Sequence, residues 1–361
     1  MTKRAQAEHG IVCRLPDRAD GYMGWPSVAR LMDGSLAVGC SGFRRYHVDP
    51  WGKTVLILGD GQGRFGPPRV VNDSPLDDRD VGVTALDGNR LLLSWFTLDT
   101  RIFSDSLAQS PGGAAFAEMS EYMKGWDEST VARHAGSWTM LSTDGGRHFQ
   151  APVRCPVSAP HGPIQRRDGS LLYLGKQFLP PYNRPWGNLS CAVSEDGAKW
   201  WEIGQVELPE GKALDQFHEP HVAELPDGSL LCLIRYHYTP QEGGNLGIYE
   251  TRSRDGGKTW SLPRDLGFQG SPPHLLWHSS GALVLSYGYR HPGYGQRARI
   301  SRDFGASWSE EWILRDDGPD DDLGYPCSVE LENGDIFTVY YQKYREDAQT
   351  SLLWTRWRLE I

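Results

Sequence analysis

The sequence predicts an all-β protein, a six-bladed β-propeller of four-stranded antiparallel blades. A two-residue turn recurs six times between short apolar runs, four of the five steps between turns are 53 to 59 residues, and a second glycine-rich motif keeps phase with them. The 361 residues include 42 Gly, 24 Pro, 14 Trp, 15 Tyr and 11 Phe, which suits many short strands and tight turns.

The recurring turn is the centre of a β-hairpin. Each copy is flanked by runs that alternate between apolar and polar residues, such as 221–226 before and 229–236 after one of them. The six turns are Asp33-Gly34, Asp87-Gly88, Asp168-Gly169, Asp227-Gly228, Ser280-Gly281 and Asn333-Gly334. One step is 81 residues long, so the second blade carries an insertion of about 104–135, whose sequence predicts mostly helix.

The second motif has the form SxDGGxxF/W. Its copies are STDGGRHF (142–149), SEDGAKWW (194–201), SRDGGKTW (253–260), SRDFGASW (301–308) and a degenerate LGDGQGRF (58–65). The Asp closes a turn, the glycines allow positive φ, and the aromatic side chain packs between neighbouring sheets. These turns therefore belong to the scaffold.

We expect residues 1–361 to form one propeller domain with blades that start near 22, 78, 159, 218, 272 and 324. An N-terminal strand around 11–15 should complete the last blade and remove its exposed edge.

Charge and composition exclude several classes of partner. The net charge is −9, which does not favour nucleic acid, and no apolar run approaches a membrane span. The six cysteines are scattered, and the N-terminus has no apolar core of a secretory signal, so we expect a cytoplasmic protein. No spacing typical of a metal site is present, and we expect no metal or other cofactor. The oligomeric state is unknown.

The register of the repeat predicts where a binding site lies. The start of each first strand and the end of each second strand share the end of the propeller that is opposite the hairpins, so polar side chains there converge on one mouth. The first-strand positions are Trp25, Arg79 or Asp80, His161, Glu219, Pro272 and Tyr325. The second-strand positions are 42–44, Trp95, Lys176, Arg235, Arg290, and Tyr341 with Gln342.

The glycine-rich boxes in phase with six hairpins resemble the Asp-boxes, or BNR repeats, of the sialidase (neuraminidase) superfamily. That resemblance implies that Tyr325 is a nucleophile and that Glu219 is the base that activates it. It also places the acid/base residue on the loop SGFRRYHVDPWGKT, where Asp49 is the matching residue. Asp80 is the other candidate for the acid/base role, but we expect it to bind a hydroxyl of the substrate instead.

The resemblance further implies three arginines that hold a sugar carboxylate. Arg235 matches the second, and the third is Arg290 or Arg297. Trp25 stands where the first arginine is expected, so Arg44, Arg79 or Lys176 would have to supply the missing charge. Among the histidines near the mouth, His47 and His161 are candidates to bind sugar hydroxyls or to transfer a proton. Trp25, Trp95 and Trp186 are candidates for stacking on a sugar.

Three functions compete on this evidence. The first is an exo-acting glycosidase that hydrolyses a terminal acidic sugar from a mono- or oligosaccharide substrate, most simply an exo-α-sialidase. The second is a uronate-directed polysaccharide lyase or hydrolase on the same propeller, which the missing first arginine and the many histidines favour. The third is a glycan-binding propeller without catalysis.

Overall fold

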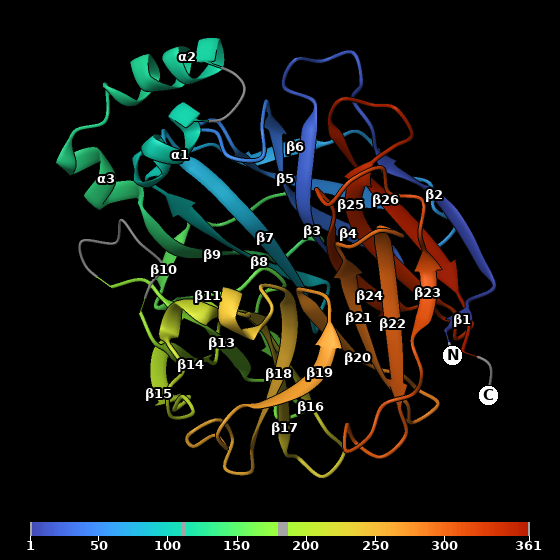
Figure 1. The fold of residues 1–361 in the computed structure, drawn as a ribbon. Helices are drawn as coiled ribbons and strands as arrows, with labels where there is room; N and C mark the ends of the chain where they lie inside the picture. Colours follow the sequence, from blue (N-terminus) through green and yellow to red (C-terminus); the bar gives the residue numbers. More distant parts are fainter. Residues whose placement is uncertain (1, 110–112, 180–186, 360–361) are drawn as a thin grey trace.

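The computed structural model describes residues 2–109, 113–179 and 187–359 and shows six antiparallel blades around an axis (Figure 1). The predicted all-β six-bladed propeller is confirmed. The first blade consists of β3 (Tyr22–Arg30), β4 (Leu36–Arg44), β5 (Lys53–Gly59) and β6 (Arg69–Asn72). The second consists of β7 (Asp77–Leu86), β8 (Arg90–Leu98), β9 (Gly136–Ser142) and β10 (Val153–Cys155). The third consists of β11 (Val157–Ser158), β12 (Ile164–Gln165), β13 (Leu171–Gln177), β14 (Leu189–Ser194) and β15 (Trp201–Gln205).

The remaining blades include both strands from the N-terminal segment. The fourth blade consists of β16 (Phe217–Glu224), β17 (Leu230–His237), β18 (Leu246–Ser253) and β19 (Arg264–Gln269). The fifth consists of β20 (Pro273–Trp277), β21 (Leu283–Tyr289), β22 (Gly295–Ser301), β23 (Trp312–Arg315) and β1 (Lys3–Arg4). The sixth consists of β24 (Gly324–Glu330), β25 (Ile336–Lys343), β26 (Thr350–Trp357) and β2 (Ala7–Cys13).

Two strands near the N-terminus close the ring. β2 pairs antiparallel with β26 and completes the sixth blade, as predicted, although it spans Ala7–Cys13 and not 11–15. β1 pairs in parallel with β23 of the fifth blade, which the sequence analysis did not predict. Figure 1 shows β1 and β2 beside β23 and β26. The fifth and sixth blades are therefore each held together by strands from distant parts of the chain.

The glycine-rich boxes bind each blade to the one before it. In the box of the fourth blade, the Asp255 carboxylate accepts a hydrogen bond from the backbone N–H of Thr259 (2.9 Å). A Cβ on Gly257 of that box would lie 2.7 Å from the Cys191 sulfur of the third blade, and one on Gly305 would lie 2.7 Å from Leu231 of the fourth. The glycines are thus required for close approach between blades as well as for the turn.

The insertion in the second blade packs against the first. It holds η1 (Thr100–Phe103), α1 (Ser104–Gln109), α2 (Gly113–Met123) and α3 (Glu128–His134), and two further 3-10 turns, η2 (Leu214–Gln216) and η3 (Pro240–Glu242), lie in the fourth blade. Met119 and Met123 of α2 pack with Trp51, and Arg45 forms an ion pair with Glu118 (2.6 Å). The helices therefore support the 45–51 loop. None of the described helices is long and apolar enough to cross a membrane.

Replacing Gly257 with Ala should destabilise the protein by about 2–4 kcal/mol, because the added methyl meets Cys191 and because φ is +95°. Gly228→Ala is the matched control: its φ is +82°, but nothing lies within 4 Å of the added Cβ, so we expect about 1 kcal/mol. Urea unfolding measures both. Equal losses would show that contact between blades is not what requires the box glycine.

Candidate active site

Four blades begin with the same backbone irregularity. Trp25, Asp80, Glu219 and Tyr325 have φ between +50° and +54°, a left-handed conformation that bulky side chains rarely adopt. Beside each of them the pairing of the first and second strands shifts register. A bulge of this kind changes the direction of a side chain. The four bulges bring together side chains that a regular strand would not.

Tyr325 and Glu219 form the centre of the site. The Tyr325 hydroxyl donates to Glu219 Oε1 (2.5 Å), while Arg235 Nη1 donates to Glu219 Oε2 (2.7 Å) and to the Tyr325 hydroxyl (3.3 Å). Burial opposes ionisation of Glu219, but Arg235 and the Tyr325 hydroxyl together lower its pKa to about 2. Glu219 is therefore a carboxylate at neutral pH, in position to take the Tyr325 proton.

Arg290 and Arg297 are the two candidates for the third predicted arginine, and Arg290 is the one near Tyr325. Its guanidinium lies 6.0 Å from the centre of the Tyr325 ring, and it forms neither a hydrogen bond nor an ion pair with any residue that the structure describes. Arg297 is buried instead and donates to the carbonyls of Gln296, Arg315 and Gly293. Arg297 is therefore a structural residue, and its prediction as a substrate ligand is wrong.

Asp80 lies in the same group but has no hydrogen-bond partner at Oδ1 among the described residues. Its side chain is buried, and burial together with the negative charge of Glu219 outweighs Arg79 and raises its pKa to about 7. Burial and the negative charges of Glu219 and Asp80 raise the pKa of Tyr325, so Asp80 is close enough to interact with the nucleophile candidate. Near neutral pH it can donate or accept a hydrogen bond.

Trp25 fills the position where the resemblance implies an arginine. Its ring is buried and lies between two cations, Arg79 at 4.3 Å and Arg44 at 4.9 Å from the ring centre. The ring centres of Trp25 and Tyr325 are 6.5 Å apart. Trp25 is thus a wall of the site that holds two guanidinium groups against its faces.

These two cations differ in what they can still bind. Arg44 is fully buried, pairs with Asp77 and donates to Ser41 and to backbone carbonyls, so it cannot reach a substrate. The prediction that Arg44 binds substrate is therefore wrong. Arg79 keeps a small exposed area and donates one N–H to Asp77 (3.2 Å), which leaves it as the cation on the Trp25 side of the site.

Asp49 does not reach the site. It is fully buried, and its carboxylate accepts hydrogen bonds from the backbone N–H groups of Arg45 (2.5 Å), Tyr46 (3.0 Å) and Trp51 (3.0 Å). Both oxygens are used to close the loop, which contradicts the prediction that Asp49 is the acid/base residue. The structure exposes His47 of the same loop in its place.

His47 is joined to residues that the sequence analysis missed. Its Nδ1 lies 2.9 Å from Asp322 Oδ1 and 2.9 Å from the Tyr22 hydroxyl, which also donates to Asp322 (2.9 Å). The His47 ring meets Trp25 edge-on at 5.0 Å. Asp322 comes three residues before Tyr325, so a polar residue shortly before a blade start was the available signal.

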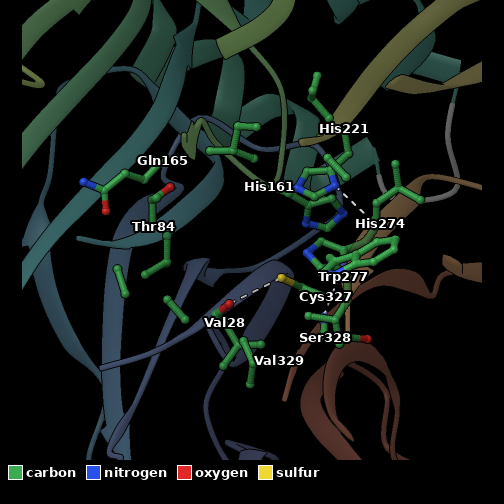
Figure 2. Close-up of a pocket in the computed structure, with 18 of the residues that line it drawn as sticks. Val28, Thr84, His161, Gln165, His221, His274, Trp277, Cys327, Ser328 and Val329 are labelled. Carbon is green, nitrogen blue, oxygen red and sulfur yellow. Dashed lines mark hydrogen bonds between the residues drawn. The ribbon is translucent and has the colours of Figure 1, made fainter. Parts of the chain in front are cut away.

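His161 lies below Tyr325, at one end of an axial channel. The channel has a volume of about 600 Å³ and is lined by the first strands on their way to the hairpin turns. Figure 2 shows His161 grouped with His221 and His274, at ring separations of 5.0 Å to His274 and 5.6 Å to His221. Burial lowers the pKa of His161 to about 4, so this floor of the site is uncharged at neutral pH.

Lys176 and Trp95 form no hydrogen bond, ion pair or ring contact with Tyr325 or Glu219 in the described part of the chain. The Lys176 ammonium is buried and donates to the Leu214 carbonyl (2.5 Å), and burial lowers its pKa to about 8. Trp95 is buried, and Trp186 lies outside the described residues. Within the described ranges, no group of three or more His, Cys, Asp or Glu side chains is placed to hold a metal ion.

Comparisons with known proteins agree with this architecture. A family model described as a BNR repeat-like domain matches residues 108–338. A curated protein named sialidase, from Bacteroides fragilis, is 25% identical over 224 residues; the match covers 55% of this chain but only 38% of that relative.

Solved structures share the fold across nearly the whole chain. A Dyadobacter fermentans protein of unknown function aligns with a TM-score of 0.76 at 23% identity and 99% coverage of both chains. The intramolecular trans-sialidase of Ruminococcus gnavus, in complex with oseltamivir carboxylate, gives 0.62 at 16% identity over 94% of this chain and 95% of its own. A GH93 α-L-arabinofuranosidase of Fusarium graminearum, in complex with arabinobiose, gives 0.62 at 12% identity over 98% and 97%.

Asp80→Asn should stabilise the folded protein more at pH 8 than at pH 5. The pKa of Asp80 is about 7 in the folded protein and near 3.8 when unfolded, so the folded state binds more protons between these values and wild-type stability falls as pH rises through them. Asn stays neutral and escapes this loss, which is worth up to ~4 kcal/mol. Urea unfolding at both pH values measures the difference, with Asp17→Asn at the exposed surface as control. A difference independent of pH would contradict the raised pKa.

Proposed function

Since the chain belongs to the family of BNR repeat-like domains, the sialidase-type propellers, we propose that it is a retaining glycoside hydrolase that releases a terminal acidic sugar. The observation that carries this proposal is the hydrogen bond from the Tyr325 hydroxyl to the Glu219 carboxylate, with Arg235 bonded to both. A binding site has no need for a phenol held against an ionised carboxylate, whereas a nucleophile does.

The proposed reaction takes two steps. As the Tyr325 oxygen forms a bond to the anomeric carbon, its proton passes to Glu219 and the glycosidic C–O bond breaks. The departing oxygen takes a proton from an acidic side chain and leaves as an alcohol. Water then attacks the anomeric carbon, gives a proton to that same side chain and displaces the Tyr325 oxygen, which recovers its proton from Glu219. Two displacements at one carbon retain its configuration.

Two cations support an acidic sugar as substrate. The Nε atoms of Arg235 and Arg290 are buried without a hydrogen-bond partner among the described residues, and Arg290 has no ion pair there either. Buried N–H groups without partners are costly unless a ligand accepts from them. A sugar carboxylate is the acceptor that suits two guanidinium groups beside the reacting centre.

Asp80 and Arg79 complete the sugar side of the site. Asp80 lies deep beside Tyr325 and Glu219, so it faces the sugar ring and is suited to hold a substrate hydroxyl. Trp25, which takes the place of one arginine, is buried and supports Arg79, which lies over its ring. Arg79 is thus the cation that this blade contributes in place of the missing arginine.

A panel of fluorogenic glycosides tests the reaction. N-acetylneuraminic acid, glucuronic acid and galacturonic acid derivatives are compared with a neutral arabinofuranoside, and the first product anomer is followed by NMR. Release of an acidic sugar with retention supports the proposal. Release of the neutral sugar alone would contradict the proposal that the site binds a sugar carboxylate. An unsaturated uronate product would indicate the lyase reaction, and binding without any product would indicate a glycan-binding protein.

Tyr325→Phe and Glu219→Gln should each lower kcat by about 10²–10⁴-fold, because the first removes the attacking oxygen and the second removes its base. The fold should persist, since neither change alters the volume greatly. Initial rates with the best glycoside measure the effect, circular dichroism checks folding, and Tyr344→Phe near the surface is the control. Full activity in either variant contradicts the pairing.

Arg290→Met should raise KM for the acidic glycoside by about 10- to 100-fold, because a charge-assisted hydrogen bond contributes roughly 1.5–3 kcal/mol. Met keeps much of the aliphatic length beside the Tyr325 ring. Steady-state kinetics with an acidic and a neutral aryl glycoside measure the change. An unchanged KM for the acidic sugar would show that Arg290 does not hold the carboxylate.

A further inference from the structure

The proposed reaction requires a proton donor for the departing oxygen, and the predicted donor is unavailable. Asp49 is enclosed by three backbone N–H groups and has no exposed surface. Its function in the fold is to hold the 45–51 loop in one shape. In this shape the loop leaves the His47 side chain at the surface, with 44% of its area exposed.

We propose that His47, oriented by Asp322, is the acid/base residue that protonates the departing oxygen, a role that rests on the proposed function. Asp322 Oδ1 lies 2.9 Å from His47 Nδ1 and binds it as an acceptor. Nε2 has no protein partner among the described residues, so it is the atom free to exchange a proton with substrate. An imidazole held at one nitrogen by a carboxylate and open at the other is built for proton transfer.

The loop that carries His47 is fixed from both sides. Asp49 holds it from within, and helix α2 holds it from outside through the Arg45–Glu118 ion pair and the packing of Tyr122 on Trp51 (5.4 Å). The His47 ring also rests edge-on against Trp25, whose other neighbour is Tyr325. This arrangement fixes a partly exposed imidazole at the border of the site.

The charges around His47 set the pH at which it works. The groups around it are Asp322 and Tyr22, which bond its ring, Arg79, which donates to the His47 backbone carbonyl (3.4 Å), and Arg290. Burial against these groups lowers its pKa below the usual 6.5, the two arginines act in the same direction, and Asp322 opposes them. Protonation of His47 therefore requires a more acidic solution than a free imidazole does, and activity that depends on the protonated ring should fall as the pH rises.

Asp80 is the competing donor and can be separated from His47 by position. It is buried close enough to Tyr325 and Glu219 to interact electrostatically with both, and the proposed function assigns it a hydroxyl of the sugar. A residue on the sugar side affects every glycoside of that sugar. A residue on the leaving-group side matters only when the departing oxygen needs a proton.

The test compares His47→Gln with wild type on two substrates of the same acidic sugar, a natural oligosaccharide and an aryl glycoside with a good leaving group. We expect kcat/KM to fall at least ~10²-fold for the oligosaccharide and only a few-fold for the aryl glycoside. The decline of wild-type kcat/KM at rising pH should be absent in the variant. His148→Gln is the matched control, because His148 also binds an Asp through Nδ1 (Asp144, 2.7 Å) but lies on a remote blade turn.

Asp322→Asn tests the orienting residue. Loss of its charge should shift the pH dependence of oligosaccharide hydrolysis to lower pH, and turnover of the aryl glycoside should fall by a smaller factor. Equal losses on both substrates in His47→Gln, or a selective loss in Asp80→Asn instead, would overturn the proposal. Failure of wild type on every acidic glycoside would overturn the proposed function itself, which is a different outcome.

Discussion

The candidate site depends on one backbone feature, a left-handed residue within a bulge at the entrance of the first strand. Four blades place Trp25, Asp80, Glu219 and Tyr325 in it. Each instance costs on the order of 1–2 kcal/mol, and the closed ring with its paired edges holds all four in place. Because of these bulges, Tyr325 and Glu219 meet at 2.5 Å although 106 residues separate them.

The number of arginines near the mouth overstates the charge available to a substrate. Arg44 and Arg297 are consumed by a buried carboxylate and by backbone carbonyls, so they stabilise the walls. Arg235 and Arg290 keep N–H groups without protein acceptors, and Arg79 is divided between Asp77 and the Trp25 face. An unbonded Nε alone does not make the distinction, because Arg297 has one too; Arg297 is structural because its Nη atoms donate to backbone carbonyls and its Nε lies 3.4 Å from Glu311, whereas Arg290 has no such partner among the described residues.

The sequence predicted the features of the fold that repeat from blade to blade. It did not predict the features that depend on contacts between distant segments of the chain. The hairpins and strand starts are local patterns, so counting from the turns located Tyr325, Glu219, Arg235 and Asp80. Asp49 and His47 share one loop, and the contacts that support this loop include helix α2, some 70 residues further on, while the partner of His47 is Asp322, 275 residues away. The parallel strand β1 pairs across the whole chain, and no local pattern indicates it.

The closing of the sixth blade has a consequence for synthesis. β2 leaves the ribosome more than 330 residues before its partner β26. During that interval β2 has an unpaired backbone, and the growing propeller keeps an open edge. The histidine, the tyrosine and the carboxylates of the candidate site come from the first, second, fourth and sixth blades. The candidate site should therefore be completed late and in a single step, when β26 inserts between β2 and β25.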